Sequence, residues 1–352
     1  MTAELPPFYC PIRRAVHPEA ARIEQRAIAW TDEIGLYRDE VERAWGIATR
    51  SAELACRVLP TGPEDTVWLF SAWNYWSFAL SDWQDGERER ASAAGVTDFT
   101  VRVIRALEEP AYRPPAGNRL TAALAELIAR TRAGTTAAQF RRLTEGLRDW
   151  LLAQSWHVAN SERRIMPELD DFAAIRPLAK GARLFAAWLE IGNGLEIPGG
   201  RRWAPDVHAL TSAAGFVVSC DNDLVGYAAG QAREIPEQNL VNVLIHQRHC
   251  SFQHAVAEAV AIRDRVLTRF LSLRNRITTI GTPELRRYAE SLNRYVRGTL
   301  DWMSSAPRYA SPRTHNDLPL PSTNLDLKIT GRPAGESTEP PDIPSIEWWW
   351  KL

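Results

Sequence analysis

This 352-residue chain has few lysines, no closely spaced pair of cysteines and no excess of positive charge. Only three lysines occur among its 42 basic residues, which 43 acidic residues balance to a formal net charge of −1. Because the chain has no strong overall charge, we expect neither nucleic acid nor a membrane as a partner. The four cysteines lie far apart without a CxxC pair, which argues against a disulfide framework and a zinc ribbon.

Long apolar runs and the signatures of several enzyme classes are also missing. No stretch approaches the about 18 apolar residues of a membrane-spanning helix. The first residues, MTAELPPFYCPIRR, have no apolar core of a signal peptide, so we expect a cytoplasmic protein. The motifs GxGxxG, GxxxxGK[ST] and GxSxG are absent, which removes the sequence support for nucleotide binding and for a serine hydrolase.

Helical periodicity is present from residue 18 to residue 310. Segments such as RLTAALAELIARTRAG place apolar residues three and four positions apart, and clusters of proline and glycine separate the segments. Alternating strand patterns with hairpin turns are missing. The pattern predicts an all-α, single-domain body over 18–310. Eleven of the 14 tryptophans precede residue 311 and indicate a large interior lined by aromatic side chains.

The two ends of the sequence differ from this body. Residues 1–17 are interrupted by prolines, and we expect an extended arm that runs over the body. Residues 311–352 are rich in proline and predict a loosely ordered tail ending in the tryptophan cluster EWWWKL. We favour docking of this cluster in a surface groove or on a neighbouring subunit, and a role in capping the site is the alternative.

An acidic cluster lies at the end of the apolar segment 68–87. Asp82 and Asp85 are three residues apart, so both project from one face of a helix. Carboxylates beside tryptophan and phenylalanine repel each other unless a cation neutralises them. Oxygen ligands suit Mg²⁺, which takes further ligands from phosphate and water. The pair therefore predicts a magnesium site, with a solvated helix end as the alternative.

A second cluster, DNDLVGYAAG, follows the apolar run AAGFVVSC. Asn222, Gly226 and Gly230 recur every four residues and share one helix face. Glycine is unfavourable inside a helix by roughly 1 kcal/mol relative to alanine, so two glycines on this face require a reason. Space for a ligand and close packing of another helix are both consistent with the pattern.

Together, the two clusters resemble those of the class I terpene synthases, which carry DDxxD on one helix and N-D-x-x-S/T-x-x-x-E on the facing helix. FALSDWQDGE (78–87) stands at the first motif and SCDNDLVGY (219–227) at the second. The resemblance extends over nearly the whole chain before residue 311. It implies the fold of that family, a class I terpenoid synthase helical bundle around an apolar cavity.

Further residues match this family in order along the chain. Arg176 precedes Asn222 by 46 residues, where the family places an arginine that senses pyrophosphate. A helix break at Gly181 follows, and Arg308–Tyr309 match the Arg-Tyr pair of the family. The resemblance implies that these four residues take part in catalysis, the arginines and the tyrosine by binding diphosphate oxygens.

The chain departs from the family pattern at several metal ligands. Ser81 replaces the first aspartate, and Gly226 and Gly230 replace the Ser/Thr and Glu of the second motif, so two ligand side chains are lost there. The resemblance leaves Asp82, Asp85 and Asn222 to hold Mg²⁺, with Asp223, Gln231 or Glu234 as substitutes. We expect fewer than the three ions of ordinary members, or weaker binding.

The reaction implied by this resemblance is the ionisation and cyclisation of a linear prenyl diphosphate, farnesyl (C15) or geranylgeranyl (C20). Two alternatives are open: a bicyclic diphosphate supplied by a class II cyclase, and a catalytically degenerate member that binds isoprenoids. Homodimers are frequent in the family, so a homodimer is a further expectation. Aromatic side chains can stabilise a carbocation. The candidates, for each of which a place in the core is the alternative, are Trp73, Trp76, Phe78, Trp83, Trp188 and Trp302.

Overall fold

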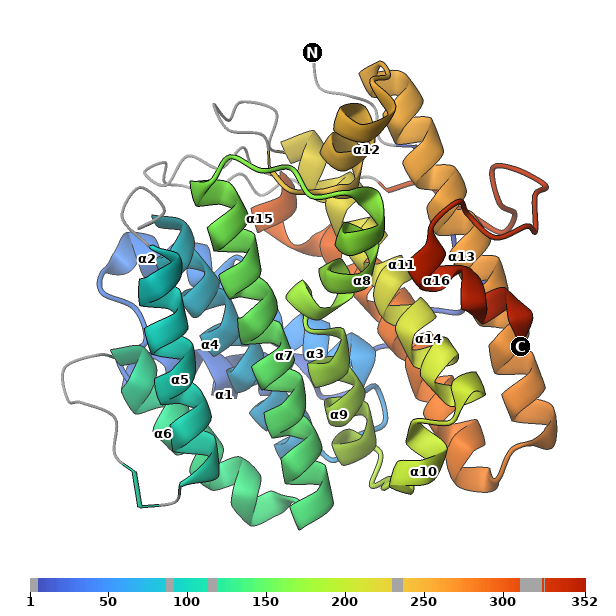
Figure 1. Ribbon diagram of the computed structural model, residues 1–352. Helices are drawn as coiled ribbons and strands as arrows, with labels where there is room; N and C mark the ends of the chain where they lie inside the picture. The colour runs from blue at the N-terminus through green and yellow to red at the C-terminus, as the bar shows by residue number, and fades with distance from the viewer. Residues whose placement is uncertain are drawn as a thin grey trace.

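The computed structural model describes residues 6–86, 92–109, 111–112, 119–229, 237–310, 325 and 327–352, and of residues 84–86, 228–229 and 310 it describes the backbone alone. Figure 1 shows an almost entirely helical molecule, which confirms the all-α prediction. The elements are β1 (Phe8–Tyr9), α1 (Ala20–Glu33), α2 (Glu40–Ile47), α3 (Ser51–Val58), α4 (Glu64–Gly86), α5 (Ala93–Glu108), α6 (Arg119–Gly134), α7 (Ala137–Glu162), α8 (Leu169–Ala179), α9 (Ala182–Gly192), α10 (Gly199–Arg202), α11 (Pro205–Ala229), α12 (Leu240–Arg248), α13 (Phe252–Ile280), α14 (Pro283–Ser305), α15 (Pro307–Ala310), β2 (Ile329–Thr330), α16 (Pro344–Glu347) and the 3₁₀ helix η1 (Trp348–Lys351).

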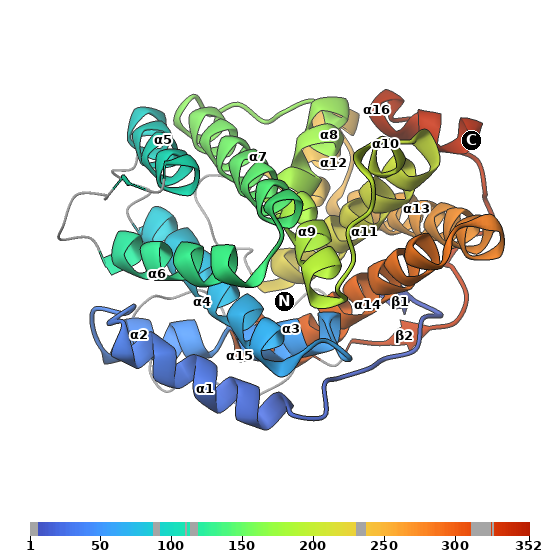
Figure 2. The same cartoon turned by 90° about the horizontal axis from the view of Figure 1, so that it is seen from below.

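The long helices stand side by side, and Figure 2 shows α3, α4, α7, α9, α11 and α14 arranged in a ring when the bundle is viewed end on. α4 and α11 are apolar on most faces, which suits helices surrounded by other helices. Phe70, Tyr75 and Leu80 of α4 and Val217 and Val225 of α11 are all fully buried. None of the described helices combines the length and apolar content needed to span a lipid bilayer.

Two close helix contacts fix the start of α9. A Cβ at Gly146 of α7 would lie 2.7 Å from the Leu184 backbone nitrogen, and one at Gly215 of α11 would lie 2.5 Å from the Ala182 Cβ. Both separations are shorter than any non-bonded carbon contact, so glycine is required at both positions. α9 begins directly after Gly181, whose φ of +72° also favours glycine. These contacts hold the predicted helix break in one place.

The two ends of the described chain meet in a two-stranded parallel sheet. Phe8 pairs with Ile329 and Tyr9 with Thr330, and the Phe8 amide donates to the Lys328 carbonyl at 2.8 Å. The amide of Cys10 donates to the Thr330 carbonyl at 2.9 Å. The arm that precedes α1 is therefore held by the segment that follows the helical body.

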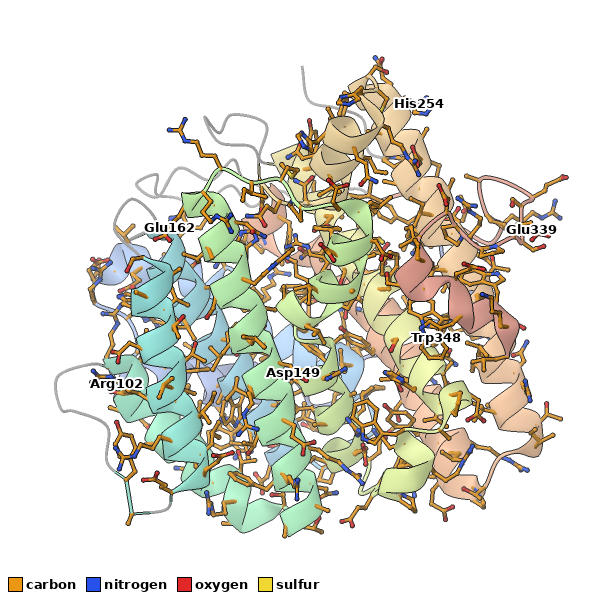
Figure 3. All side chains as sticks on the ribbon, in the orientation of Figure 1. Arg102, Asp149, Glu162, His254, Glu339 and Trp348 are labelled. Atoms are coloured by element: carbon orange, nitrogen blue, oxygen red, sulfur yellow. The ribbon has the colours of Figure 1, made fainter. Side chains whose placement is uncertain are left out.

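Residues 327–352 differ from the expectation of a loosely ordered tail. They pack on α8, α11 and α13, and Trp349 is only 3% exposed. Arg269 of α13 donates to the Trp349 carbonyl at 2.8 Å, and the Ser345 amide donates to Asp170 of α8 at 2.6 Å. The proline content suggested disorder, but the buried tryptophan and these hydrogen bonds stabilise a docked segment. Figure 3 shows Trp348 of this segment on the outer face of the bundle.

Candidate active site

A cavity of about 220 Å³ lies inside the bundle. Side chains from α4, α7, α8, α9, α11, α14 and α15 line it, so elements far apart in the sequence converge there. Eight of the residues assigned to catalysis, to metal or to the aromatic wall line it, as do Ser81 and Asp223; the eight are Phe78, Arg176, Gly181, Asn222, Gly226, Trp302, Arg308 and Tyr309. Polar and charged members of this set come from α8, α11 and α15, and the aromatic members Phe78 and Trp302 come from α4 and α14.

Asp82 and Arg308 form an ion pair in which Arg308 lines the cavity and Asp82 lies behind it, outside the set of lining residues. The Arg308 Nη1 donates to Asp82 Oδ2 at 2.7 Å, and its Nη2 donates to the other carboxylate oxygen. The guanidinium lies over the Phe78 ring, 5.4 Å from its centroid. Asp82, which the resemblance assigns to metal binding, and Arg308, which it assigns to diphosphate binding, therefore neutralise each other's charge in this structure. The bidentate arrangement is the one that arginine also offers to phosphate oxygens.

Asn222 and Tyr309 are joined by a hydrogen bond. The Asn222 Nδ2 donates to the Tyr309 hydroxyl at 2.8 Å, which directs the Asn222 Oδ1 away from the phenol. Since α11 and α15 are not neighbours in sequence, only the fold brings the amide and the phenol together. The contact leaves the Asn222 oxygen as the group available to a cation.

Arg176 is held by Asp223 in a buried ion pair. The Arg176 Nε lies 3.0 and 3.2 Å from the two Asp223 oxygens. Burial alone would lower the pKa of Arg176, but the charge and hydrogen bonds of Asp223 raise it above the ordinary value. Asp223 also accepts the Leu240 amide at 3.0 Å. Its oxygens are thus engaged with Arg176 and the start of α12 in this structure, and its role as a substitute metal ligand stays a prediction.

A second buried ion pair lies behind the second metal motif. Arg263 of α13 donates to both oxygens of Asp221, at 2.7 and 3.2 Å, and also to the Tyr9 carbonyl. It contacts Asp264 at 3.1 Å, and Asp264 in turn accepts the Ala334 amide at 2.9 Å. The chain ends are therefore connected through hydrogen bonds to the residue that precedes Asn222.

Gly226 opens space on the cavity wall. A Cβ built on Gly226 would meet no atom within 4 Å, so close packing of another helix does not explain this glycine. The same face of α11 carries Asn222 one turn earlier. Gly230, Gln231, Glu234 and the side chain of Asp85 lie outside the described residues.

The donor set fits a hard cation only with help from other ligands. Asn222 lines the cavity with its amide, the Asp82 carboxylate reaches the lining only through its pair with Arg308, and the space at Gly226 leaves room for water. Within the described ranges, no group of three or more His, Cys, Asp or Glu residues is arranged to hold a metal ion. A divalent ion here would need oxygens from water and from the substrate, as Mg²⁺ accepts readily.

Only two of the six aromatic candidates line the cavity within the described part of the chain. Phe78 and Trp302 do so, with ring centroids 5.7 Å apart. Trp73 and Trp76 are buried in the core and donate to Thr131 Oγ1 and to the Leu120 carbonyl, each at 2.8 Å. These two are core residues, because α4 buries several of its faces and periodicity alone does not select the one that borders the cavity.

The other two candidates also pack elsewhere. Trp188 stacks on Phe70 with ring centroids 5.0 Å apart, and the ring centroids of Trp83 and Phe99 are 5.7 Å apart. Trp150, Phe185 and Tyr295 line the cavity but were missed from the sequence. The spacing of Tyr295, Thr299 and Trp302 along one face of α14 was the signal that would have identified Tyr295.

Gly181 borders the cavity at the expected helix break. Its amide donates to the Leu178 carbonyl at 2.8 Å, and its carbonyl accepts the Phe185 amide at 2.8 Å as the first hydrogen bond of α9. The carbonyl at this break therefore belongs to the helix and keeps one lone pair for a further contact.

Comparisons with known proteins agree with this geometry. Residues 72–269 match the family described as terpene synthase family 2, C-terminal metal binding. Spiroviolene synthase of Streptomyces violens is 33% identical, over 99% of this chain and 96% of its own. A germacradien-6-ol synthase of Streptomyces pratensis is 29% identical over 99% and 97%. The crystal structure of the SVS_A2 protein, from ancestral sequence reconstruction, is 36% identical with a TM-score of 0.81 and 99% coverage of both chains. With its helical bundle, its converging charged side chains and these relatives, the chain belongs to the class I bacterial terpene synthases.

Proposed function

We propose that this chain ionises a linear prenyl diphosphate, farnesyl or geranylgeranyl, and cyclises its hydrocarbon chain with release of diphosphate. One observation carries the proposal: Arg176, Asn222, Arg308 and Tyr309 converge on the cavity that Phe78 and Trp302 also line. Such a cavity offers a charged end for diphosphate and an aromatic interior for the isoprenoid chain. The names of two further relatives, a T-muurolol synthase described as cyclizing farnesyl diphosphate and a diterpene cyclase, support cyclisation as the reaction.

The polar end of the cavity has the groups that diphosphate requires. When diphosphate enters, Arg308 gains an anionic partner of the same bidentate geometry as Asp82 and transfers to it. That transfer frees the Asp82 carboxylate. Arg176 stays charged in its buried pair and supplies a second positive charge. The Tyr309 hydroxyl accepts from Asn222, and as a phenol it is also a hydrogen-bond donor that suits a diphosphate oxygen.

Asp82 and Asn222 are the described residues that would hold Mg²⁺, together with water and diphosphate oxygens. When bound, the ion stabilises negative charge that develops on the leaving diphosphate. Because Asp82 becomes free only when Arg308 leaves it, metal and diphosphate are expected to bind cooperatively.

The apolar end of the cavity suits the hydrocarbon chain and the cation derived from it. A cation is attracted by an aromatic face within about 6 Å of the ring centroid. The Phe78 and Trp302 rings border the cavity and lie against each other, which places two such faces near the charged end. The surrounding helices keep bulk solvent away from the cation, so that it can rearrange before it is quenched.

The direct test incubates the pure protein and Mg²⁺ with geranyl, farnesyl and geranylgeranyl diphosphates. Released diphosphate is measured, and extracted products are analysed by gas chromatography with mass spectrometry. We expect diphosphate release and a cyclic product with the C15 or the C20 substrate, and neither when a chelator removes the metal. Folded protein that is silent with all linear substrates and active with a bicyclic diphosphate would instead support a partner of a class II cyclase.

A further inference from the structure

Two buried polar groups of the cavity wall are unexplained by the proposed function. Asn74 of α4 is 6% exposed and Tyr295 of α14 is 1% exposed, and both residues line the cavity. Within the part of the chain that the structure describes, neither the Asn74 amide nitrogen nor the Tyr295 hydroxyl has a hydrogen-bond partner. Native proteins rarely leave such groups unpaired, because each costs about 1–3 kcal/mol. Since both groups line the cavity, they are placed to pair with a polar ligand there.

Asn74 lies between two layers of aromatic side chains, and the ring of Tyr295 belongs to the first layer. On α4, Asn74 is one helical turn from Phe70 and one turn from Phe78. In the first layer, the ring centroids of Phe70 and Phe185 are 5.3 Å apart, and those of the stacked Phe185 and Tyr295 rings are 4.9 Å apart.

The second layer lies about two turns further along the helices α4 and α14, which stand in the ring of Figure 2. There, Phe78 contacts Trp302 at 5.7 Å. Between the layers, Thr299 also lines the cavity, and its hydroxyl donates to the Tyr295 carbonyl at 2.8 Å. The Thr299 oxygen keeps lone pairs with which it can accept a hydrogen bond.

The chemistry of these groups selects water as the ligand. A hydrocarbon chain has no atom that pairs with an amide or a hydroxyl, and diphosphate has its own partners in Arg176, Arg308 and Tyr309. A water molecule occupies about 30 Å³ and needs two to four polar partners. The cavity of about 220 Å³ is large enough for it. The amide and the two hydroxyl groups together supply donors and acceptors.

We propose that Asn74 and Tyr295 hold one water molecule in the aromatic part of the cavity, and that this water captures the carbocation to give a terpene alcohol. The inference rests on the proposed cyclase function. In the step, a lone pair of the water oxygen forms a C–O bond with the cationic carbon. The resulting oxonium loses one proton to the released diphosphate, so no oxidant or reductant is needed.

Tyr295 acts in this step as a hydrogen-bond partner. Burial raises the pKa of its phenol well above the ordinary value, so the hydroxyl keeps its proton at neutral pH. Tyr295 and Asn74 are therefore positioning residues for the water, and the released diphosphate is the base.

The experiment measures the share of alcohol among the products in water enriched in oxygen-18. It compares wild type with Tyr295→Phe and Asn74→Leu, using C15 and C20 substrates. Tyr288→Phe is the matched control, because Tyr288 is a buried tyrosine of the same helix whose hydroxyl bonds Thr211 at 3.0 Å. Thermal unfolding verifies that each variant is folded, and a crystal structure of the wild type looks for water at the Tyr295 hydroxyl.

We expect an alcohol that carries oxygen-18 from the wild type and from the control. In Tyr295→Phe and Asn74→Leu the ratio of alcohol to hydrocarbon should fall roughly tenfold, as for the loss of one hydrogen bond. Unchanged ratios in both variants, or a dry site in the crystal, would overturn the inference. Diphosphate release with hydrocarbon products alone would overturn it and leave the proposed function standing. No diphosphate release at all would overturn both.

Discussion

The empty space at Gly226 allows a sharp test of the metal site. Replacing Gly226 by serine restores the residue type that the family uses, and the new Cβ meets no atom within 4 Å. The change also replaces a glycine inside α11, which should stabilise the helix by roughly 0.5 kcal/mol. Gly226→Ala is the matched control, because it fills the same space without an oxygen and should stabilise the helix by about 1 kcal/mol.

The two variants should differ in their need for metal. Serine adds an oxygen donor on the helix face of Asn222, so we expect Gly226→Ser to lower the Mg²⁺ concentration for half-maximal turnover about fivefold, or about 1 kcal/mol. Alanine displaces any water from this space and supplies no donor, so Gly226→Ala should need the same Mg²⁺ concentration as wild type or a higher one.

The assay follows diphosphate release against Mg²⁺ concentration at saturating substrate, with thermal unfolding of each variant measured in the absence of metal. The unfolding data separate the helix effect from the ligand effect. The reasoning fails if serine and alanine give the same Mg²⁺ dependence, or if serine requires more Mg²⁺ than wild type. Either result would mean that position 226 does not face the ion.

Three further predictions test the charged groups. Asp82→Asn keeps the size and removes the charge, so turnover should fall at least roughly a hundredfold in the diphosphate assay, and the melting temperature should fall as well because Arg308 loses the charge of Asp82. Arg176→Met leaves Asp223 buried without its cation, and urea unfolding should show a loss of about 3 kcal/mol or more. Burial, together with the positive charge of nearby Arg183, lowers the pKa of His208. The ring centroid of His208 lies 5.5 Å from that of Trp348. Because the pKa of His208 is lower in the folded protein than in the unfolded chain, its protonation below pH about 6.5 destabilises the folded state. Limited proteolysis should therefore release the Trp348 segment more readily at pH 5 than at pH 8.

Each of these has a control or an opposing outcome. Asp149→Asn removes a carboxylate whose partner is the surface Arg183, and it should keep full turnover; Figure 3 labels Asp149 on α7. An Arg176→Met protein as stable as wild type would show that Asp223 does not need its partner. Equal proteolysis at both pH values, or an unchanged pH dependence in His208→Gln, would remove histidine from the docking of the tail.

The helical body was predictable because its signal is local. Apolar residues three and four positions apart and proline or glycine at the breaks specify helices without knowledge of their neighbours. The ion pair of Asp82 with Arg308 and the bond of Asn222 with Tyr309 join helices far apart in sequence. Periodicity contains no information on such pairs, so only the resemblance to a family placed these residues in one site.

The failures have equally physical causes. Trp73 and Trp76 were candidates for the cavity because α4 is apolar on most faces, and an all-round apolar pattern does not say which face borders an empty space. The tail was expected to be loose because proline is common there. Its order depends instead on Trp349 and on pairing between residues near positions 8 and 329, which composition does not record.

The parallel pairing of β1 with β2 has a consequence for biosynthesis. A ribosome adds about 5–20 residues per second, so the arm with Phe8 emerges on the order of half a minute before Ile329 exists. Until then, the arm has no strand to pair with, and the carbonyl of Tyr9 that Arg263 binds is not held in place. Completion of the support behind Asn222 therefore waits until the residues around Ile329 are made.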